Sequence, residues 1–248
     1  MKDLNSLIRL TVVLTMLLAS SACTTLKATD DPSLQSSSDP LSGINRGVYR
    51  FNSAADKALL KPVAKTYNAI MPEPAQKAVG HFFNNLGEPV NVLNHLLQGK
   101  FDGALSSTFR FAVNSTLGVF GLFDVAKAYE VPRKTEDLGQ TLAAWGVKPG
   151  PYLVMPFLGP SNFRDGFGSI VDSFAFNPVM EISDDGNKRT GLTILNVIDV
   201  RARLSGSADL LDHQLDPYSF LKEAFEQSRL RSIYDGNPPA RSEDDLDF

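Results

Sequence analysis

The side chain whose position most clearly suggests a chemical role is the thiol of Cys23, the single cysteine of the chain. It follows an apolar run at residues 10–18 (LTVVLTMLL) and four small residues at 19–22 (ASSA). One cysteine cannot form a disulfide within the chain, so no disulfide framework is expected. A free exposed thiol is reactive in an oxidising compartment. A modification that consumes the thiol, such as acylation, would remove that reactivity.

The start of the chain has the pattern of a secretory signal peptide. Lys2 and Arg9 precede the apolar run at residues 10–18. This run is much shorter than the roughly 20 residues needed to span a membrane. The small residues before Cys23 resemble the lipobox of bacterial lipoproteins, although Ser20 stands where that pattern usually has a large aliphatic residue. We predict a signal peptide at residues 1–22 and a lipid-anchored Cys23. The alternative is an ordinary signal peptide with an incidental cysteine.

No catalytic or metal-binding motif stands out in the remaining sequence. It contains no G-x-S-x-G nucleophile elbow, no H-E-x-x-H pair and no phosphate-binding P-loop. The histidines, His81, His95 and His213, have no metal-ligand spacing, and a structural or surface role is favoured for each. We therefore predict that the protein is not an enzyme and uses no cofactor or metal.

The composition divides the chain into an anchor, a tether, one domain and a tail. The net charge of −4 and the absence of a basic stripe argue against nucleic acid binding. Residues 23–38 would carry the lipid and form a polar tether, and residues 39–234 would form one helical domain. Residues 235–248 (DGNPPARSEDDLDF) have the composition of a disordered acidic tail. No later stretch is apolar enough to predict a transmembrane helix.

The domain has mainly helical periodicity, with apolar residues recurring at every third or fourth position. Asp39-Pro40 and Asp216-Pro217 are good helix starts, because aspartate caps a helix and proline suits its first position. Further helices are predicted to begin at Pro72, at Glu88-Pro89, and over 102–117, 121–129, 136–145 (capped by Thr135), 162–175 (capped by Ser161) and 187–205. An alternating strand pattern is almost absent, so the predicted fold class is mainly α.

Residues 146–168 (GVKPGPYLVMPFLGPSNFRDGFG) are apolar but cannot form one helix. Four prolines interrupt the segment, and its glycines favour tight turns. Two interpretations stay open: a loop packed across the helices as part of the core, or a loop that lines or gates an apolar cavity. Gly146 could be the left-handed cap of the preceding helix or a hinge. Arg164 and Asp165 could form a local ion pair or contact a polar headgroup.

Several predicted helices are apolar on more than one face. Examples are Phe82-Phe83 and the run at residues 117–123 (LGVFGLF). A helix that is apolar on several faces is either buried or in contact with lipid. In a chain with a membrane anchor, these faces favour contact with a bilayer, and a well-filled core is the alternative.

Four ordered segments resemble the MlaA (VacJ) lipoproteins of Gram-negative bacteria. They are "DPLSGINRGVYRFN" (39–52), "NNLGEPVNVLNHLLQGK" (84–100), "RFAVNSTLGVFGLFDVA" (110–126) and "DLGQTLAAWGVKPGPYLVMPFLGPSNFRDGFG" (137–168). The resemblance implies a single compact, ring-like, multi-helix domain around an amphipathic central channel. It also implies an outer-membrane lipoprotein, held in the periplasm-facing leaflet, that removes mislocalised phospholipids from the outer leaflet and so maintains lipid asymmetry.

The resemblance further implies partners and site residues. The partners would be trimeric outer-membrane porins and a soluble periplasmic phospholipid carrier of the MlaC kind. The segment after the "TLAAWG" helix would gate the channel, and a helix carrying "YRFN" would line it. The alternative function is a structural, porin-associated envelope lipoprotein without transport activity. The residues expected at the channel are Gly146, Gly150, Tyr152, Pro156, Phe157 and Gly159 in the segment, Tyr49, Phe51 and Asn52 on the helix, and Arg164 and Asp165 as headgroup candidates.

Overall fold

The computed structural model describes residues 39–175 and 185–239, and these are mainly helical, as predicted. The chain begins with a long helical arm that consists of α2 (Ser42–Ala55), a π-helical turn η1 (Asp56–Leu60) and α3 (Lys61–Ile70). The helix does not start at the predicted Asp39-Pro40 cap. The Asp39 carboxylate instead accepts hydrogen bonds from Asn45 and Tyr218, so it is not available to cap α2.

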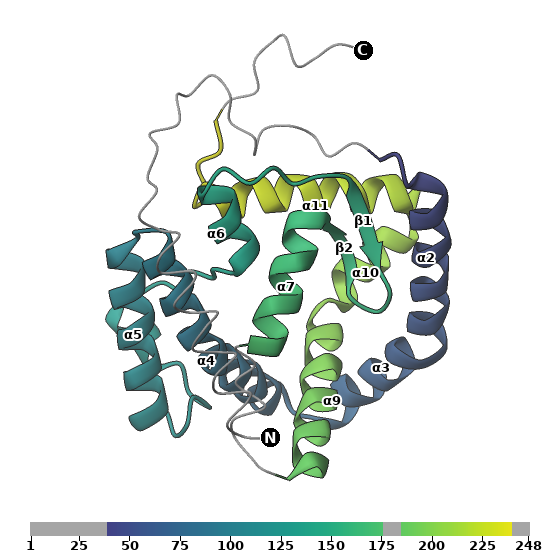
Figure 1. Cartoon of the computed structure of the whole chain (residues 1–248). Coiled ribbons are helices and arrows are strands. Elements are labelled where there is room, and N and C mark those ends of the chain that lie inside the picture. The colour runs from purple at the N-terminus through teal and green to yellow at the C-terminus, as the bar shows by residue number, and fades with distance from the viewer. Residues whose placement is uncertain (1–38, 176–184, 240–248) are drawn as a thin grey trace.

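Helices α4 (Glu73–Leu97) and α5 (Phe101–Thr116) lie side by side at one edge of the molecule (Figure 1). The predicted break at Glu88-Pro89 is wrong, because Pro89 lies inside α4. Proline removes one helical hydrogen bond, but α4 keeps its course while burying a polar face against its neighbours. Four residues at helical spacing make up that buried face: Asn85, Glu88, Asn91 and Asn94.

The next part of the chain is less helical than predicted. Only a short 3₁₀ turn, η2 (Val125–Tyr129), forms in the expected helix 121–129. Val119, Phe120 and Gly121 have positive φ values, which end α5 in a tight turn. Helix α6 (Leu138–Ala144) then starts at Asp137, whose side chain accepts a hydrogen bond from the Gln140 N–H. Asp137 therefore caps this helix, and the predicted cap, Thr135, does not.

The Gly/Pro-rich segment contains a β-hairpin that the sequence analysis missed. Strands β1 (Tyr152–Met155) and β2 (Gly159–Asn162) pair antiparallel, with Tyr152 opposite Asn162 and Met155 opposite Gly159. Helix α7 (Phe163–Ala175) follows directly. Two strands of four residues, with a proline in β2, have little intrinsic stability, so the hairpin depends on its neighbours.

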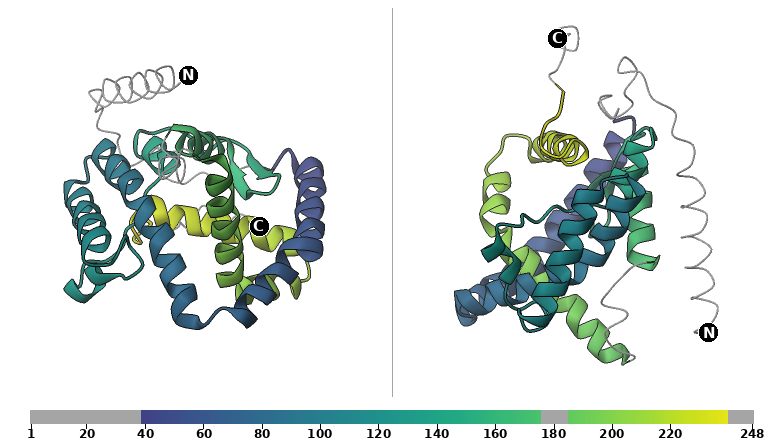
Figure 2. Two further views of the ribbon diagram at one scale, coloured as in Figure 1. Left: turned by 90° about the horizontal axis from the view of Figure 1, so that it is seen from below. Right: turned by 90° about the vertical axis from the view of Figure 1, so that its left-hand side faces the viewer.

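The last helices are α9 (Gly186–Arg203), α10 (Ser205–Asp212) and α11 (Pro217–Ile233). Asp216 caps α11 as predicted, by accepting a hydrogen bond from the Ser219 N–H. Figures 1 and 2 show α11 crossing the molecule from the side of α6 to the side of α2. In Figure 1 the helices α2, α3, α9, α4, α6 and α11 surround α7 and the hairpin. Among the described helices, none is long and apolar enough to cross a membrane.

Candidate functional site

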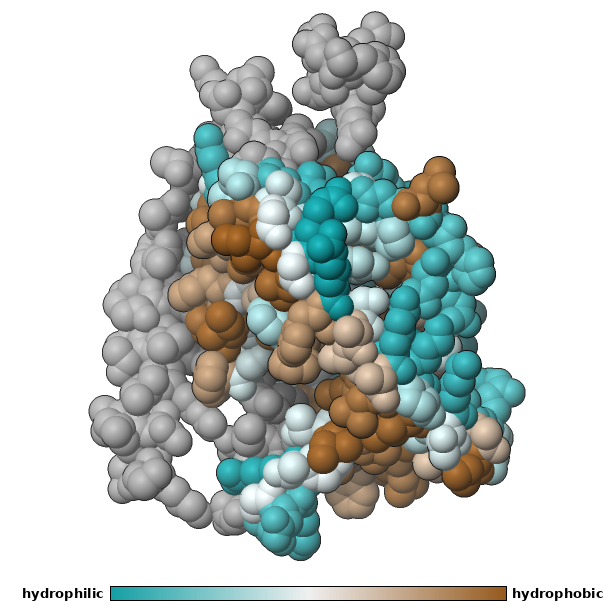
Figure 3. Space-filling model, turned by 90° about the vertical axis from the view of Figure 1, so that its right-hand side faces the viewer, coloured by the Kyte–Doolittle hydropathy of each residue, from teal (hydrophilic) through white to brown (hydrophobic). Residues whose placement is uncertain are grey.

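The described part of the chain has an unusual distribution of polarity. Polar and charged side chains outnumber apolar ones among its buried residues. The apolar core cluster consists of Tyr152, Val154 and Tyr218, with a few partly buried neighbours. Many large apolar side chains are exposed, and Figure 3 shows them gathered in patches on one face, separated by hydrophilic bands. Large exposed apolar patches are typical of surfaces that contact a membrane, a ligand or another protein.

Helix α7 carries one of these apolar surfaces. Phe163, Phe167, Ile170 and Phe174 are all exposed and recur at spacings of four, three and four residues, so they share one face. The other face packs closely on α6: a Cβ added to Gly168 would lie 2.5 Å from the backbone nitrogen of Gly139. The close contact fixes the rotation of α7 and directs its phenylalanine stripe away from α6.

Residues 117–123 form a second exposed apolar surface, next to α5. Leu117, Phe120 and Phe123 are 65%, 76% and 60% exposed. These side chains therefore do not fill the core, which was the alternative interpretation of their apolar pattern.

The tip of the hairpin is also apolar and exposed. Phe157 is 74% exposed and packs edge-on against Phe51 of α2, with ring centroids 5.3 Å apart. Its φ of +62° is a conformation that aromatic residues seldom adopt. Asn52 holds this turn in place: its side-chain oxygen accepts from the Phe157 N–H at 2.9 Å, and its amide donates to the Met155 carbonyl at 3.0 Å.

A second asparagine of α2 binds the same hairpin two helical turns earlier. The Asn45 amide donates to the Tyr152 carbonyl at 3.0 Å, and its oxygen accepts from the Val154 N–H at 3.0 Å. Asn45 is fully buried. Together, Asn45 and Asn52 clamp β1 and the turn to α2, and we call this arrangement the asparagine clamp. The sequence analysis missed Asn45, although the seven-residue spacing of two asparagines was a signal that they share a face.

The structure brings the predicted helix residues and segment residues together. Tyr49 is partly buried and packs on Tyr218, with ring centroids 6.0 Å apart, beside the core cluster. Tyr152 is fully buried, although it was expected at a channel. Pro156 lies in the turn that follows β1. Gly159 has a φ of +87°, and a Cβ added there would have no other heavy atom within 4 Å beyond its chain neighbours.

Gly146 has the geometry of a helix cap. Its φ is +84°, its N–H donates to the Ala143 carbonyl, and the next N–H, of Val147, donates to the Leu142 carbonyl. This pair of hydrogen bonds is the Schellman motif that commonly ends a helix at glycine. The structure thus supports the cap, one of the two interpretations left open by the sequence. Gly150 is likewise left-handed, and a Cβ added there would lie 3.2 Å from Phe163 Cβ.

We expect Gly146→Ala to lower the free energy of unfolding by about 1–2 kcal/mol, because an L residue is strained in the left-handed region. Gly146→Asn should cost less, since asparagine tolerates that conformation better. Thermal unfolding of both variants in detergent checks this order. Equal stability of the wild type and the alanine variant would instead favour the hinge interpretation of Gly146.

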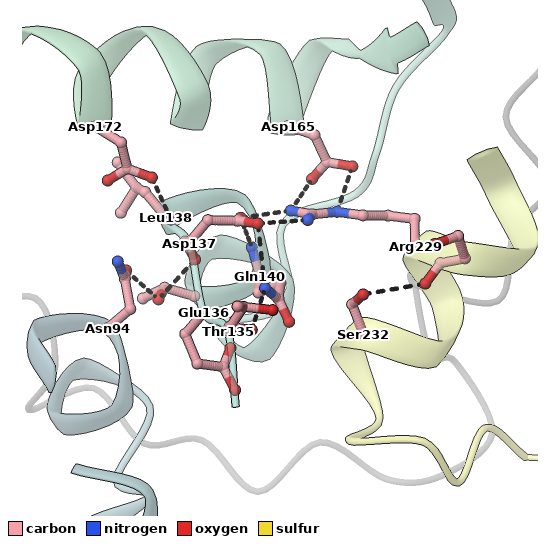
Figure 4. A network of polar contacts seen from close by, with 12 residues as sticks. Asn94, Thr135, Glu136, Asp137, Leu138, Gln140, Asp165, Asp172, Arg229 and Ser232 are labelled. Carbon is pink, nitrogen blue, oxygen red and sulfur yellow. Dashed lines mark hydrogen bonds and ion pairs between the residues drawn. The ribbon is translucent and has the colours of Figure 1, made fainter. Parts of the chain in front are cut away.

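Arg164 and Asp165 lie in a buried ion network rather than at the surface. Each is 5% exposed, and Arg164 Nε lies 2.9 Å from Asp165 Oδ1. Arg229 of α11 extends between Asp137 and Asp165, with distances of 2.6 and 2.9 Å to them (Figure 4). Arg164 also donates to the Val147 carbonyl, so the network holds the chain after α6. A contact between Arg164 or Asp165 and a lipid headgroup would require this network to open.

Asp172 of α7 is a carboxyl group with an unfavourable environment. Its Oδ2 accepts a hydrogen bond from the Leu138 N–H at 2.9 Å (Figure 4). Burial, with a smaller effect from the nearby Asp137 charge, raises the pKa of Asp172 to about 6. Since the native state binds the proton more tightly than the unfolded chain, stability falls as the pH rises from about 4 to about 6.

We therefore expect Asp172→Asn to stabilise the protein at neutral pH, by about 1–2 kcal/mol, and to flatten the pH dependence of the melting temperature between pH 4 and pH 7. At pH 4 the variant and the wild type should melt alike. Thermal unfolding across this pH range tests the expectation, with Glu223→Gln as the control at an exposed position of α11. A loss of stability in the variant at neutral pH would show that the ionised carboxylate is needed.

Comparison with known proteins assigns this architecture. A family model described as "MlaA lipoprotein" matches residues 37–232. The chain belongs to the MlaA lipoprotein family. It is 37% identical over 198 residues to the intermembrane phospholipid transport system lipoprotein MlaA of Escherichia coli, covering 78% of this chain and 77% of that protein. It is 31% identical over 228 residues to the MlaA of Haemophilus influenzae, covering 90% and 91% of the two chains.

Other similarities agree with the family. An uncharacterized protein of Rickettsia felis is 35% identical over 195 residues, covering 79% of this chain and 78% of that one. A solved structure described as the "Structural basis for maintenance of bacterial outer membrane lipid asymmetry" matches with a TM-score of 0.68 and 32% identity. The match covers 81% of this chain and all of that chain, so the helical fold is shared.

Proposed function

We propose that this protein removes mislocalised phospholipids from the outer leaflet of the outer membrane through an amphipathic channel and passes them to a periplasmic lipid carrier. The observation that carries the proposal is the reversed polarity of the domain, with polar side chains buried and large apolar side chains exposed. Such a surface is favourable in contact with acyl chains and costly in water. The family relative in E. coli is named as part of an intermembrane phospholipid transport system, and this supports a role in phospholipid transport.

The features around the asparagine clamp suit a lipid path. A phospholipid needs an apolar wall for its acyl chains and a few polar groups for its headgroup. The α7 stripe and the hairpin tip at Phe157 and Leu158 offer apolar contacts. We propose that the segment between α6 and α7 is the gate of the channel. It contains Gly146, Gly150, Pro156 and Gly159. In this proposal Phe51 and Asn52 control how far the hairpin tip moves.

The anchor and the partners complete the proposal. Cys23 lies outside the described residues, as do the tether and the end of the acidic tail beyond residue 239. We propose that acylated Cys23 holds the domain in the periplasm-facing leaflet of the outer membrane. The porins and the MlaC-like carrier are proposed on the family resemblance. No covalent chemistry is needed, because a lipid that moves to its preferred leaflet needs only a passage.

Phospholipid content of the outer leaflet tests this function directly. It should rise in cells that lack the protein and return to normal when the wild-type chain is restored. An unchanged content, together with perturbed porins or envelope, would favour the alternative of a structural porin-associated lipoprotein.

Cys23→Ala should fail to restore the normal lipid content, because the uncleaved or unanchored chain would not stay at the outer membrane. Membrane fractionation of the variant checks its location. Full function with the variant still in the outer membrane would contradict the lipid anchor.

A further inference from the structure

A pocket of about 350 Å³ lies between α3, α9 and α10, away from the asparagine clamp. The polar residues that line it include three cations and one carboxylate. They are Lys61, Lys65, Asn68, Arg201, Ser205 and Asp209. The function proposed above gives this pocket no role.

Ion pairs hold two of the cations in fixed positions. Lys61 Nζ lies 3.0 Å from Asp209 and 3.1 Å from Asp212. Arg201, which lines the pocket, binds both oxygens of Asp56 through Nε and Nη2. The Asp209 pKa is lowered by its hydrogen bond with Lys61, so this carboxylate stays charged at neutral pH.

Lys65 supplies the excess positive charge. It is exposed and lies one helical turn after Lys61, on the same face of α3. Within residues 39–175 and 185–239, its ammonium group makes no hydrogen bond or ion pair. Ser205, the first residue of α10, lies on the opposite wall of the pocket.

The π-helical turn η1 marks the same place in the fold. π-helical turns are rare and frequently occur at functional sites. Here the turn carries Asp56, which binds Arg201, and Lys57, which binds Asp212 at 3.1 Å. It therefore organises the ion pairs beneath the pocket, while the face of α3 with Lys61 and Lys65 follows immediately.

An apolar track leads away from the pocket along α9. Ile194 and Val197 are 54% and 45% exposed, and their spacing places them on the same helix face as Arg201. Leu204, at the end of α9, is 50% exposed. A charged pocket that adjoins an exposed apolar track has the two kinds of surface that one phospholipid molecule requires.

We propose that this pocket binds a zwitterionic phospholipid headgroup, with the phosphodiester on Lys65, Lys61 and Arg201 and the amine on Asp209. Three cations and one carboxylate in a single pocket match a headgroup that carries both signs of charge. The acyl chains would lie along Ile194 and Val197. The inference names the substrate class for the proposed transport function, and in that sense it rests on that function.

Photo-crosslinking from inside the pocket tests the inference. The full-length, lipid-anchored chain with Ala69→p-benzoylphenylalanine is placed in vesicles of equal phosphatidylethanolamine and phosphatidylglycerol, with radioactive phosphorus in one lipid at a time. Ala69 lines the pocket but is not a proposed contact. We expect a radioactive adduct on the protein, stronger with phosphatidylethanolamine. Introducing Lys65→Glu into the same chain should lower the yield of this adduct about tenfold, as expected for the loss of a hydrogen bond to a charged group.

Two further variants make the result specific. Lys188→Glu changes the same charge at an exposed position near the start of α9, and it should leave the adduct unchanged. Asp209→Asn should remove the preference for phosphatidylethanolamine. An adduct that is insensitive to Lys65→Glu would overturn the headgroup pocket. Complete competition by inorganic phosphate would assign the pocket to free phosphate and also overturn the proposal.

The outcome is distinguishable from a failure of the transport function. A Lys65-dependent adduct, in a protein whose deletion leaves outer-leaflet phospholipid unchanged, would retain the pocket and reject transport. A Lys65-independent adduct, with a normal deletion phenotype, would retain transport and reject the pocket. Because Lys65 is exposed, the variant should fold, and its melting temperature checks this.

Discussion

Arg229→Met should lower the free energy of unfolding by about 3–5 kcal/mol, the largest stability loss we expect from one substitution in this protein. Arg229 reaches from α11 to Asp137 on one side and Asp165 on the other, and its side chain is 15% exposed. Methionine can fill much of the space, but it leaves the partly buried Asp137 carboxylate without its cation and leaves the buried Asp165 carboxylate with the Arg164 cation alone. For a domain of this size, the melting temperature should fall by roughly 10 °C.

The pH dependence of this effect follows from Asp137. Burial alone would raise the pKa of Asp137, but hydrogen bonds and charge from Arg229 outweigh it and hold the pKa below its ordinary value. The stability from this pair is therefore present at neutral pH and is lost as the pH falls through the native pKa. The difference in melting temperature between the wild type and Arg229→Met should shrink in acid.

Two variants serve as controls for Arg229. Arg231→Met changes an exposed arginine on the same helix and should alter stability by less than about 0.5 kcal/mol. Adding Asp137→Asn to Arg229→Met should recover part of the loss, because it removes the carboxylate charge that the variant leaves unpaired. Equal melting of the wild type and Arg229→Met would show that the network contributes nothing to stability.

Asn45→Ala should cost about 2–4 kcal/mol, since it leaves a buried carbonyl and a buried N–H of β1 without partners. Asn45 is fully buried and lies between β1 and Asp39, whose carboxylate it also contacts at 2.9 Å. The hairpin would then lose the contact that holds β1 against α2. Thermal unfolding measures the loss, and hydrogen exchange at the Val154 amide should rise in the variant.

Asn52→Ala is the matched comparison, because Asn52 binds the same hairpin at its exposed end. The Phe157 N–H that it holds is exposed, so water can replace the lost acceptor and the stability cost should be under about 1 kcal/mol. We expect its main effect on the mobility of the hairpin tip and therefore on outer-leaflet phospholipid. Equal losses of stability in the two variants would contradict the division of the clamp into a structural and a mobile end.

Much of the fold followed from signals between residues close in sequence. The Asp216-Pro217 start of α11 is such a signal, because the cap and the proline act within one turn. The helical period also predicted α7 and α9 nearly to their ends. Local reasoning failed at Pro89, where packing of the polar face of α4 outweighs the cost of a proline.

The site depended on pairs that are far apart in the sequence. Asn45 meets β1 across 107 residues, and Arg229 meets Asp137 across 92. No local propensity encodes such pairs, and two four-residue strands give too short a sequence pattern to be predicted without the helix that holds them. The sequence analysis therefore expected a shaped loop and offered a local Arg164–Asp165 ion pair, but it missed the hairpin, Asn45 and the link from Arg229 to that pair.

The sequence by itself determined that the chain is mainly helical, that several helices have strongly apolar faces, and that residues 146–168 need turns. Only the tertiary structure decided which way those faces point. Periodicity places Phe163, Phe167 and Phe174 on one side of α7, but a stripe facing a core and a stripe facing outward have the same period. The close contact of Gly139 with Gly168 turns that stripe outward. Burial of polar side chains such as Asn45, Glu88 and Arg110 in the interior is what leaves the apolar faces for the surroundings.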